Sequence, residues 1–219
     1  MKREIVHTSD GSTTIYLPEW EENYHSKHGA IQEAKHVFIK NGFDKFDQDE
    51  ISILEIGFGT GLNAFITFLE AKDSSKTVYY SGVEAYPVDF SEVAQMNYVN
   101  ELQATDFEGE FQKMHTSDWN VNVKISDNFF LTKRKMFFAE IADVEAFDLI
   151  YFDAFGYRVQ PELWSTEIFQ KMYNALKPGG KLVTYAARGV VKRSMIEVGF
   201  SVEKLAGPPG KREMFLASK

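Results

Sequence analysis

Cysteine is absent from this 219-residue sequence, which excludes a disulfide framework, a thiolate metal site and a cysteine nucleophile. No apolar run approaches the length that spans a membrane, and the polar amino terminus lacks the apolar stretch of a secretion signal. Internal repeats and low-complexity linkers are also missing. We therefore expect a cytoplasmic protein, and the length allows a sizeable core within a single compact domain.

Basic residues are outnumbered, because 24 Lys and Arg face 32 Asp and Glu and give a net charge of -8. This balance argues against nucleic acid as a partner, since phosphate contacts supply much of the affinity for it. The uneven distribution of the basic residues qualifies that argument. They cluster at Lys133-Arg134-Lys135, at Arg188 with Lys192 and Arg193, and at Lys211-Arg212. A solvated face and a nucleic-acid-binding patch both stay open on this evidence.

The most informative stretch is Glu55-Ile-Gly-Phe-Gly-Thr-Gly61, which follows an apolar run and precedes a helical pattern. A buried parallel strand reads as such a run, and the glycines Gly57, Gly59 and Gly61 allow a tight turn close to a ligand. The helix that begins with Leu62 and Asn63 aims its free N-H groups at the same place. The glycine spacing differs from the Gly-x-Gly-x-x-Gly of dinucleotide sites. It resembles motif I of class I methyltransferases, whose ligand is S-adenosylmethionine.

A second acidic residue supports a nucleoside ligand. Glu84 ends the apolar run 77–83, roughly 20 positions after the glycine loop, where a carboxylate is placed to accept hydrogen bonds from ribose hydroxyls. Because the same residue type occurs in enzymes that use NAD, Glu84 indicates a nucleoside without naming it. We assign Glu55, Gly57, Gly59, Gly61, Asn63 and Glu84 to cofactor binding.

Helical and strand-like patterns alternate along most of the chain, which is typical of a parallel sheet covered by helices. An irregular segment, 1–26, precedes an amphipathic helix over 30–39, and residues 1–45 are expected to form an extension packed on a domain of residues 46–219. The less regular stretch 105–146 offers only strand fragments at 129–132 and 136–138. The other expected strands are 52–57, 77–84, 147–152, 181–185, 200–205 and 213–217, and the expected helices are 62–71, 89–99, 161–176 and 188–198.

Asp153 directly follows the buried strand 147–152, and ligands of open α/β sheets bind beyond such strand ends. A carboxylate there can hold an attacking amine, favour the departure of its proton, or stabilise positive charge that passes from sulfur to nitrogen. Methyl transfer is an in-line displacement in which alignment contributes much of the rate, so we assign Asp153 orientation first. A structural cap on its loop is the alternative. Tyr185, at the end of the next strand, is the second catalytic candidate.

Several segments carry a wider resemblance when they are taken together and in order. They are Gly29-Ala-Ile-Gln-Glu33, the glycine loop, Asp153-Ala-Phe155 with Pro161-Glu-Leu-Trp164, Thr184-Tyr-Ala-Ala-Arg-Gly189 with Lys192-Arg193, and Gly210-Lys-Arg-Glu-Met214. The chain resembles the MnmC/MnmD family of tRNA methyltransferases, which convert 5-aminomethyl-2-thiouridine to 5-methylaminomethyl-2-thiouridine at the wobble position. Bifunctional members of that family also carry a flavin-dependent oxidase domain.

The resemblance implies a fold, a cofactor and a partner. The fold is the α/β, Rossmann-like class I methyltransferase fold, with a mostly parallel seven-stranded sheet and a terminal β-hairpin. The cofactor is S-adenosylmethionine, with neither FAD nor a metal ion, and the partner is the anticodon stem-loop of tRNA. A chain that ends at Lys219 is expected to be the stand-alone methyltransferase, and separate enzymes would supply its aminomethyl substrate.

Residue roles that the resemblance implies complete the expected site. Glu140 would meet the adenine, with Asp143 as the other candidate, and Gln32 and Glu33 would help to close the pocket. Phe155 is available to stack on a loop base, as are Tyr16, Tyr24, Tyr157, Trp164 and Tyr185, and two or three of these residues are expected to face the cleft. From their clustering in the sequence, and not from the resemblance, we expect Lys192, Arg193, Lys211 and Arg212 to form one phosphate-binding rim beside the carboxyl ends of the strands. Two alternatives stay open, namely a class I methyltransferase of a small-molecule amine or a protein, and a regulator that binds S-adenosylmethionine without catalysis.

Overall fold

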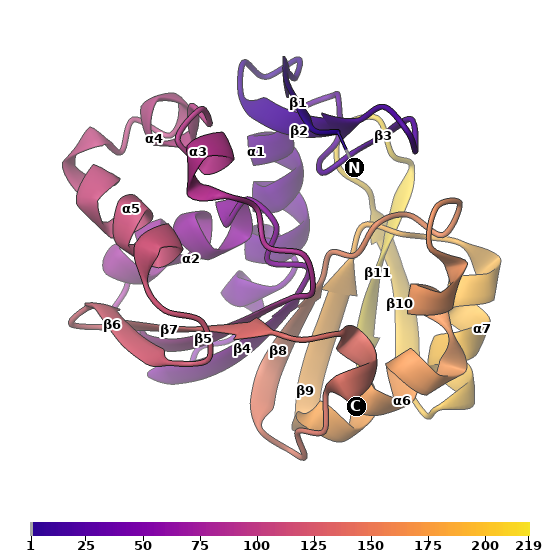
Figure 1. Ribbon diagram of the computed structural model, residues 1–219. Coiled ribbons are helices and arrows are strands. Elements are labelled where there is room, and N and C mark those ends of the chain that lie inside the picture. Colours follow the sequence, from indigo (N-terminus) through magenta and orange to yellow (C-terminus); the bar gives the residue numbers. More distant parts are fainter. Residues whose placement is uncertain (1) are drawn as a thin grey trace.

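An eight-stranded sheet forms the centre of the protein in the computed structural model, which describes residues 2–219 (Figure 1). The strand order is β10-β11-β9-β8-β4-β5-β7-β6. The middle strands, from β9 to β7 in this order, run parallel, while β11 and β6 pair antiparallel with their neighbours. The strands are β4 (Glu50–Ile56), β5 (Thr77–Glu84), β6 (Asn122–Ser126), β7 (Phe129–Lys135), β8 (Phe147–Phe152), β9 (Leu176–Thr184), β10 (Ser201–Ala206) and β11 (Glu213–Ser218).

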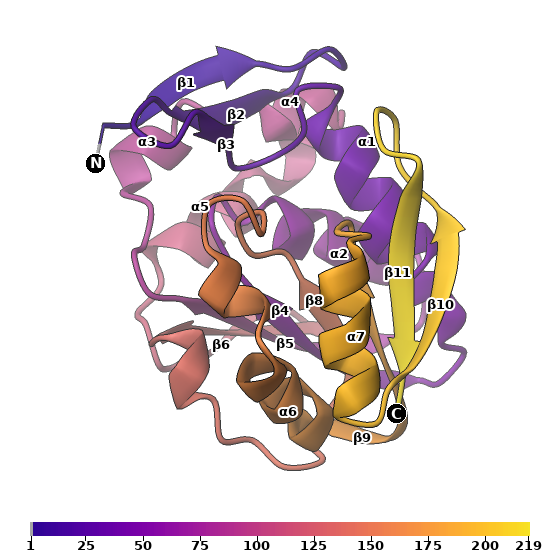
Figure 2. The same cartoon turned by 90° about the vertical axis from the view of Figure 1, so that its right-hand side faces the viewer.

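Helices cover both faces of this sheet, so its central strands are buried on both sides (Figures 1 and 2). Along β8, Leu149 and Tyr151 belong to one core cluster, whereas Ile150 and Phe152 belong to the other. The alternation follows from the two-residue repeat of a strand, and burial on both faces explains the continuous apolar run in the sequence. One face carries α1 (Ala30–Ala34) with a π-helical continuation (Lys35–Lys40), α2 (Leu62–Lys72), α3 (Phe90–Val93), α4 (Tyr98–Glu101) and α5 (Glu108–Thr116), and the other carries α6 (Thr166–Ala175) and α7 (Gly189–Glu197).

The amino-terminal segment is ordered, and the sequence-based expectation of an irregular segment over 1–26 is wrong. It forms a three-stranded antiparallel sheet of β1 (Glu4–His7), β2 (Thr13–Leu17) and β3 (Glu22–Asn23). Gly11, with φ +89°, lies in the turn between β1 and β2. This small sheet lies beyond the carboxyl ends of the central strands (Figure 1, top). Its Ile15 and Leu17 join the main core, which fixes it above that edge.

The mostly parallel sheet with its closing hairpin is confirmed, but it has eight strands instead of seven. The additional strand, β6, pairs with β7 at the outer edge of the sheet. Its Asn-Val-Lys-Ile-Ser sequence alternates weakly, and the short turn at Asp127 and Asn128 connects it to β7. The expected strand fragment 136–138 is wrong, since Phe138–Glu140 is instead one turn of 3-10 helix.

The expected helix 89–99 is interrupted, because Asn97 lies between α3 and α4 and makes a tertiary contact. Its side-chain oxygen accepts the Thr13 N-H at 2.8 Å, which ties β2 to this connection. Helix α5 was not predicted, since its polar sequence has only Phe111 and Met114 as buried positions. The remaining helical segments are single turns of 3-10 helix at Phe43–Lys45, Thr105–Phe107 and Pro161–Trp164.

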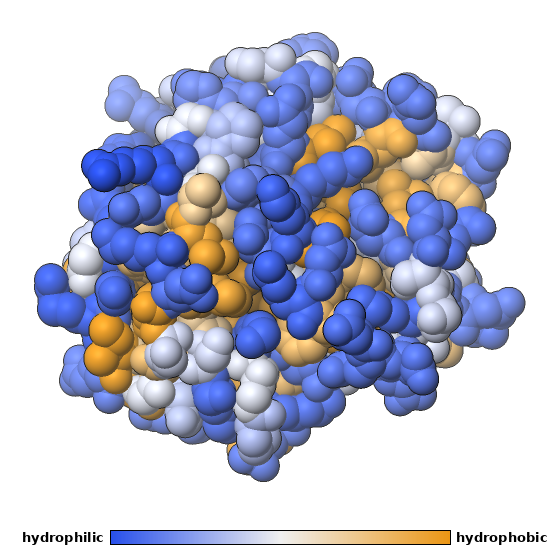
Figure 3. All heavy atoms as spheres, turned by 180° about the vertical axis from the view of Figure 1, so that it is seen from behind, coloured by the Kyte–Doolittle hydropathy of each residue, from blue (hydrophilic) through white to orange (hydrophobic). Residues whose placement is uncertain are grey.

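Polar side chains cover most of the face seen in Figure 3, and apolar residues show mainly in bands between them. Within residues 2–219, no helix combines the length and the apolar character needed to traverse a bilayer.

Candidate active site

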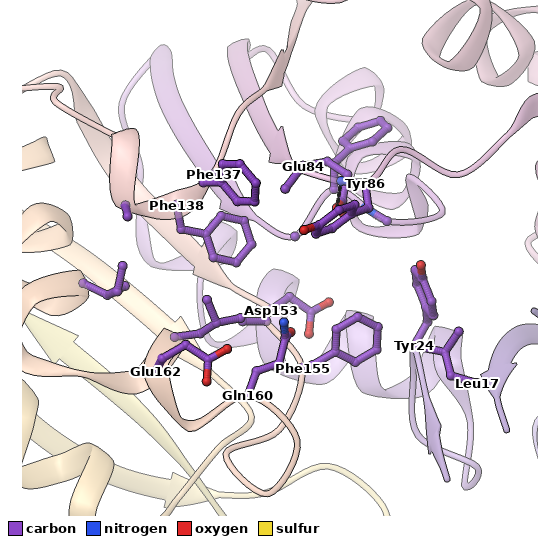
Figure 4. Close-up of a pocket in the computed structure, with 18 of the residues that line it drawn as sticks. Leu17, Tyr24, Glu84, Tyr86, Phe137, Phe138, Asp153, Phe155, Gln160 and Glu162 are labelled. Atoms are coloured by element: carbon purple, nitrogen blue, oxygen red, sulfur yellow. Dashed lines mark hydrogen bonds between the residues drawn. The ribbon is translucent and has the colours of Figure 1, made fainter. Parts of the chain in front are cut away.

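A cavity of about 1020 Å³ lies beyond the carboxyl ends of β4, β5 and β8. Gly57 after β4, Glu84 at the end of β5 and Asp153 after β8 all line it, as expected for an open α/β sheet. Tyr24 and Leu17 from the amino-terminal sheet line another side (Figure 4). The volume is at the upper end of the roughly 300 to 1,000 Å³ typical of small-molecule sites.

The glycine loop adopts a backbone that only glycine accepts easily. Gly57, Gly59 and Gly61 have φ values of +93°, +50° and +71°. A Cβ atom on Gly57 would lie 2.6 Å from the Asp153 carbonyl oxygen, so this glycine lets the loop approach the one after β8. Gly57 and Gly59 line the cavity, whereas Gly61 packs its open side against the His115 ring.

Glu84 is held by the loops on either side of it. Its carboxylate accepts the Gly59 N-H at 3.2 Å and the Tyr86 N-H at 2.9 Å. A carboxylate has about four acceptor positions, so two such bonds leave capacity for a pair of ligand hydroxyls. The geometry is compatible with the expected ribose contact.

Asn63 joins two carboxyl groups under and beside the cavity. From the first turn of α2, its amide nitrogen donates to Glu55 Oε1 at 2.9 Å and to Asp153 Oδ2 at 2.8 Å. Glu55 is fully buried below the lining residues, and burial raises the pKa of its carboxyl group well above the usual range. Glu55 Oε2, Asn63 Oδ1 and the Tyr80 hydroxyl are buried without a hydrogen-bond partner among the described residues, and of these three residues only Asn63 lines the cavity.

Asp153 is the titratable group at the centre of the cavity (Figure 4). Burial raises its pKa to about 7, and the negative charge of Glu33 acts in the same direction. The hydrogen bond from Asn63 and the positive charge of Lys211 act in the opposite direction. A carboxyl group with such a pKa is partly protonated and partly ionised near neutral pH, so it can exchange a proton or a hydrogen bond with an amine.

Tyr185 supports the Asp153 loop from behind. Its hydroxyl donates to the Ala154 carbonyl at 2.8 Å, and its ring lies 3.9 Å from Lys211 Nζ. Tyr185 is not among the residues that line the cavity. The structure therefore places this catalytic candidate next to the loop instead of at the reacting face.

Aromatic rings form two walls of the cavity. On one side, Trp20 and Tyr24 meet Phe155 edge to face, with ring centroids 5.4 and 5.0 Å apart. On the other, Tyr86 and Phe137 form a similar pair at 5.9 Å and are largely exposed at the mouth. Phe155 was expected here from the sequence.

The sequence indicated Tyr24 as a stacking candidate, but it did not predict the amino-terminal sheet that brings Tyr24, Trp20 and Leu17 to the cavity. Arg3 and His25 also line the cavity. His25 Nδ1 is 2.9 Å from the Thr14 hydroxyl, and burial lowers the pKa of this histidine to about 4, so its ring is neutral. The available signal was the concentration of Tyr16, Trp20 and Tyr24 in a segment without helical periodicity.

Other expected site residues lie elsewhere. Glu140 is outside the cavity lining, because its carboxylate turns back to accept the Phe137 N-H at 2.7 Å, and Asp143 pairs with Arg134 at 2.8 Å. Phe137, Phe138 and Ala139 line the cavity in their place. Gln32 is exposed on α1, and Glu33 is buried against Lys211. Arg193 and Arg212 are exposed and Lys192 is half-buried, and none of the three lines the cavity.

Metal-binding side chains are not grouped in this protein. Within residues 2–219, no three His, Asp or Glu side chains come together in a way that could hold a metal ion. The cavity is instead built from glycine backbone, aromatic rings and the acidic side chains of Glu84, Asp153, Glu162 and Glu167.

Known proteins resemble this chain over most of its length. In sequence, the bifunctional protein MnmC of tRNA 5-methylaminomethyl-2-thiouridine biosynthesis from Campylobacter fetus subsp. fetus is 28% identical over 98% of this chain and 35% of its own length. The protein of the same name from Leptospira interrogans is 29% identical over 96% of this chain and 34% of its own. This chain thus spans about a third of the length of these relatives.

Solved structures agree on the fold. MnmC2 from Aquifex aeolicus superposes with a TM-score of 0.75 at 21% identity, over 99% of this chain and 70% of that chain. Spermidine synthase from Thermotoga maritima superposes with a TM-score of 0.55 at 14% identity, over 98% and 72%. Together these matches confirm the predicted fold class and the resemblance to the MnmC/MnmD family. Residues 92–219 match the family described as S-adenosyl-L-methionine-dependent methyltransferase, and the chain belongs to that family.

Proposed function

We propose that this chain is an N-methyltransferase that converts 5-aminomethyl-2-thiouridine to 5-methylaminomethyl-2-thiouridine at the wobble position of tRNA. The observation that carries the proposal is Asp153, a carboxylate that faces the cavity between the glycine loop and the aromatic wall. An aminomethyl group on a base needs these three neighbours, namely a methyl donor, a carboxylate and a surface for stacking. The names of the MnmC relatives, which refer to the biosynthesis of this nucleoside in tRNA, support the same substrate.

On the cofactor side, Gly57 and Gly59 would admit S-adenosylmethionine through their lack of side chains, and Glu84 would accept hydrogen bonds from its ribose. The apolar slot between Tyr86 and Phe138 is open for the adenine (Figure 4). The bound cofactor supplies a methyl group activated by a positively charged sulfur.

On the substrate side, Asp153 would hold the acceptor amine through its N-H groups and so direct the nitrogen lone pair toward the methyl group. After transfer the nitrogen carries a positive charge, which the ionised Asp153 stabilises. Phe155, with Trp20 and Tyr24 against it, offers a face on which a splayed-out loop base can stack. Alignment of the amine is the main contribution that these residues make to the rate.

The direct test uses labelled S-adenosylmethionine with bulk tRNA that carries 5-aminomethyl-2-thiouridine, followed by nucleoside analysis. We expect label in 5-methylaminomethyl-2-thiouridine and none in fully modified tRNA. Label transfer to small amines or to protein, with none to tRNA, would support the alternative class of substrate. Binding of S-adenosylmethionine without transfer to any of these acceptors would favour a regulator. The aminomethyl group itself would come from a separate enzyme.

Substitution of Glu84 tests the ribose contact. We expect Glu84→Gln to weaken S-adenosylmethionine binding by roughly 1 to 3 kcal/mol, because a charged acceptor of two hydroxyls is lost. Isothermal titration calorimetry measures this directly. Glu140→Gln serves as the comparison, since its side chain lies outside the cavity. A loss of affinity in Glu140→Gln and none in Glu84→Gln would move the contact to the loop after β7.

The tRNA rim would consist of Lys192, Arg193 and Arg212, beside α7 and the closing hairpin. Arg212 and Lys192 both lie near Glu213. The hydrogen bond from Lys204 lowers the pKa of the Glu213 carboxyl group, and the positive charges of Arg212 and Lys192 lower it further. The basic cluster Lys133-Arg134-Lys135 is the other candidate for a phosphate contact. Its Lys133 is buried and donates to the His115 carbonyl at 2.7 Å. Lys133 is therefore not available to a phosphate.

Charge reversal tests this rim. We expect Arg193→Glu with Arg212→Glu to raise the KM for tRNA and to flatten the dependence of log affinity on log salt by somewhat less than one unit per lost contact. Affinity for S-adenosylmethionine should stay the same. The matched control is Lys113→Glu with Lys124→Glu on α5 and β6, at the sheet edge opposite β10. If both double variants changed the KM for tRNA and its salt dependence equally, binding of tRNA would depend on the net charge of the protein and not on this rim.

A further inference from the structure

Lys211 points into the protein instead of toward solvent. It lies between β10 and β11, and its ammonium group forms an ion pair with the carboxylate of Glu33 from α1. The Glu33 side chain is 8% exposed and the Lys211 side chain 30%. The other Glu33 oxygen accepts the Ser26 N-H at 3.1 Å, so the carboxylate is held on both sides. The expected phosphate-binding role of Lys211 does not match this arrangement.

A short chain of contacts leads from this pair to the centre of the cavity. Lys211 Nζ lies 3.9 Å from the centroid of the Tyr185 ring, and the Tyr185 hydroxyl donates to the Ala154 carbonyl, next to Asp153. The charges of Glu33 and Lys211 both act on the Asp153 carboxyl, in opposite directions. The ion pair is therefore close enough to the cavity to affect which charges are stable there.

Other ionisable groups also face this region. Asn63 donates a hydrogen bond to Asp153 and another to Glu55, whose pKa is raised by burial. Of the described residues, Lys211 is the cation that acts directly on Asp153. The remaining groups that interact electrostatically with Asp153, Glu55, Tyr185 or Lys211 are Tyr80, Tyr151, Glu84, Glu22, Arg188 and His25.

We propose that Lys211 balances the charge of Glu33 beside the cavity, so that Asp153 ionises and the acceptor amine stays neutral more readily than with Glu33 alone, which makes Lys211 a positioning residue for methyl transfer. This inference rests on the proposed amine acceptor. Without Lys211, two carboxylates would surround the amine and stabilise its protonated form, which has no lone pair for attack. Without Glu33, the Lys211 ammonium would compete with the substrate for Asp153. In a partly desolvated site both imbalances matter more than in water.

The two single substitutions are expected to act in opposite directions. In Lys211→Met the loss of the cation raises the pKa of Asp153, and the acid limb of the kcat profile moves to higher pH. In Glu33→Gln the loss of the anion lowers that pKa, and the limb moves to lower pH. At a fixed pH below the acid limb, kcat changes by about tenfold for each pH unit by which the limb moves. The double variant restores charge balance, and its profile should return to within about threefold of the wild type.

The readouts separate this role from a tRNA contact. We expect Lys211→Met to change the pH profile of kcat and to leave the KM for tRNA, its salt dependence and the affinity for S-adenosylmethionine unaltered. Lys204→Met is the matched control, because Lys204 lies on the same hairpin in an exposed pair with Glu213 at 2.9 Å. This control should behave as the wild type. A raised KM for tRNA with an unmoved pH profile in Lys211→Met would overturn the inference.

A measurement without turnover keeps the inference testable if the tRNA activity is not found. The carboxyl carbon of Asp153 can be titrated by NMR in the wild type, Lys211→Met and Glu33→Gln. The midpoint should rise in the first variant and fall in the second, whatever the substrate proves to be. Equal Asp153 midpoints in all three proteins would show that the Lys211–Glu33 pair is only structural. If Lys211→Met does not fold, Lys211→Arg should keep the wild-type midpoint and Glu33→Gln still decides the direction.

Discussion

Asp153→Asn is expected to lower kcat by about 100-fold or more while S-adenosylmethionine binds almost as before. The amide has the shape of the carboxyl group, so the cavity and the hydrogen bond network around Asn63 can persist. The negative charge that faces the amine is lost, and with it the stabilisation of the positive charge that forms on nitrogen. Single-turnover kinetics with the aminomethyl tRNA, together with calorimetry for the cofactor, measure the two effects separately.

The pH dependence sharpens this result. Since the Asp153 pKa is about 7, the wild-type carboxyl is protonated in acid and kcat should rise through neutral pH as it ionises. The asparagine variant should lack this limb. A raised carboxyl pKa also means that ionisation destabilises the folded state once the pH exceeds the unfolded value of about 3.9. Asp153→Asn should therefore unfold at the same temperature as the wild type near pH 4 and at a higher temperature at pH 8.

The same measurements address the structural alternative for Asp153. A residue that only caps its loop would, when replaced, reduce stability at every pH and affect cofactor binding and turnover together. A variant that is fully active across the pH range would leave Asp153 without a part in the chemistry.

Gly59→Val is expected to reduce the affinity for S-adenosylmethionine by at least about 100-fold. The added side chain would project beside Tyr24, where a Cβ atom already meets the ring at 3.3 Å, and would fill space at the cavity wall. Left-handed backbone adds roughly 1 to 2 kcal/mol of strain for any residue but glycine. The result should be a folded protein with no measurable heat of cofactor binding.

Strain alone must be separated from blockage of the cavity. Gly179 provides the control, because it also has positive φ, at +80°, but a Cβ there meets nothing within 4 Å. Gly179→Val should show the same kind of destabilisation in thermal unfolding and normal cofactor binding. Equal losses of affinity in both variants would mean that the glycine loop acts through stability and does not contact the cofactor.

Sequence reasoning succeeded where local pattern and topology determine position. The run 147–152 forms β8 with the predicted bounds. A strand that is buried on both faces needs a continuous apolar sequence, which makes it easy to recognise. Gly57, Glu84 and Asp153 lie at the cavity because each is at the carboxyl end of a parallel strand, and these ends meet at one edge of the sheet. Residues 13–17 were missed although Thr-Thr-Ile-Tyr-Leu favours a strand, because the polar neighbours on both sides obscured it.

The direction of long side chains could not be predicted. Lys211 and Arg212 are adjacent and look alike in the sequence, yet one is paired with a buried carboxylate from α1 and the other is exposed. Glu140 occupies the expected loop, but its carboxylate accepts the Phe137 N-H of the same turn. In each case the partner is set by tertiary packing, which one sequence does not reveal. The break at Asn97 has the same origin, since it depends on Thr13 far away in the chain.

The position of β11 bears on how this protein folds as it is synthesised. This last strand lies between β9 and β10, so β10 reaches the sheet only through a segment that leaves the ribosome after it. Met214 and Leu216 of β11 share a core cluster with Ile15 near the start of the chain. Contacts between such distant segments form late and slowly. The core cluster that includes the amino-terminal strands is therefore complete only after β11 has left the ribosome.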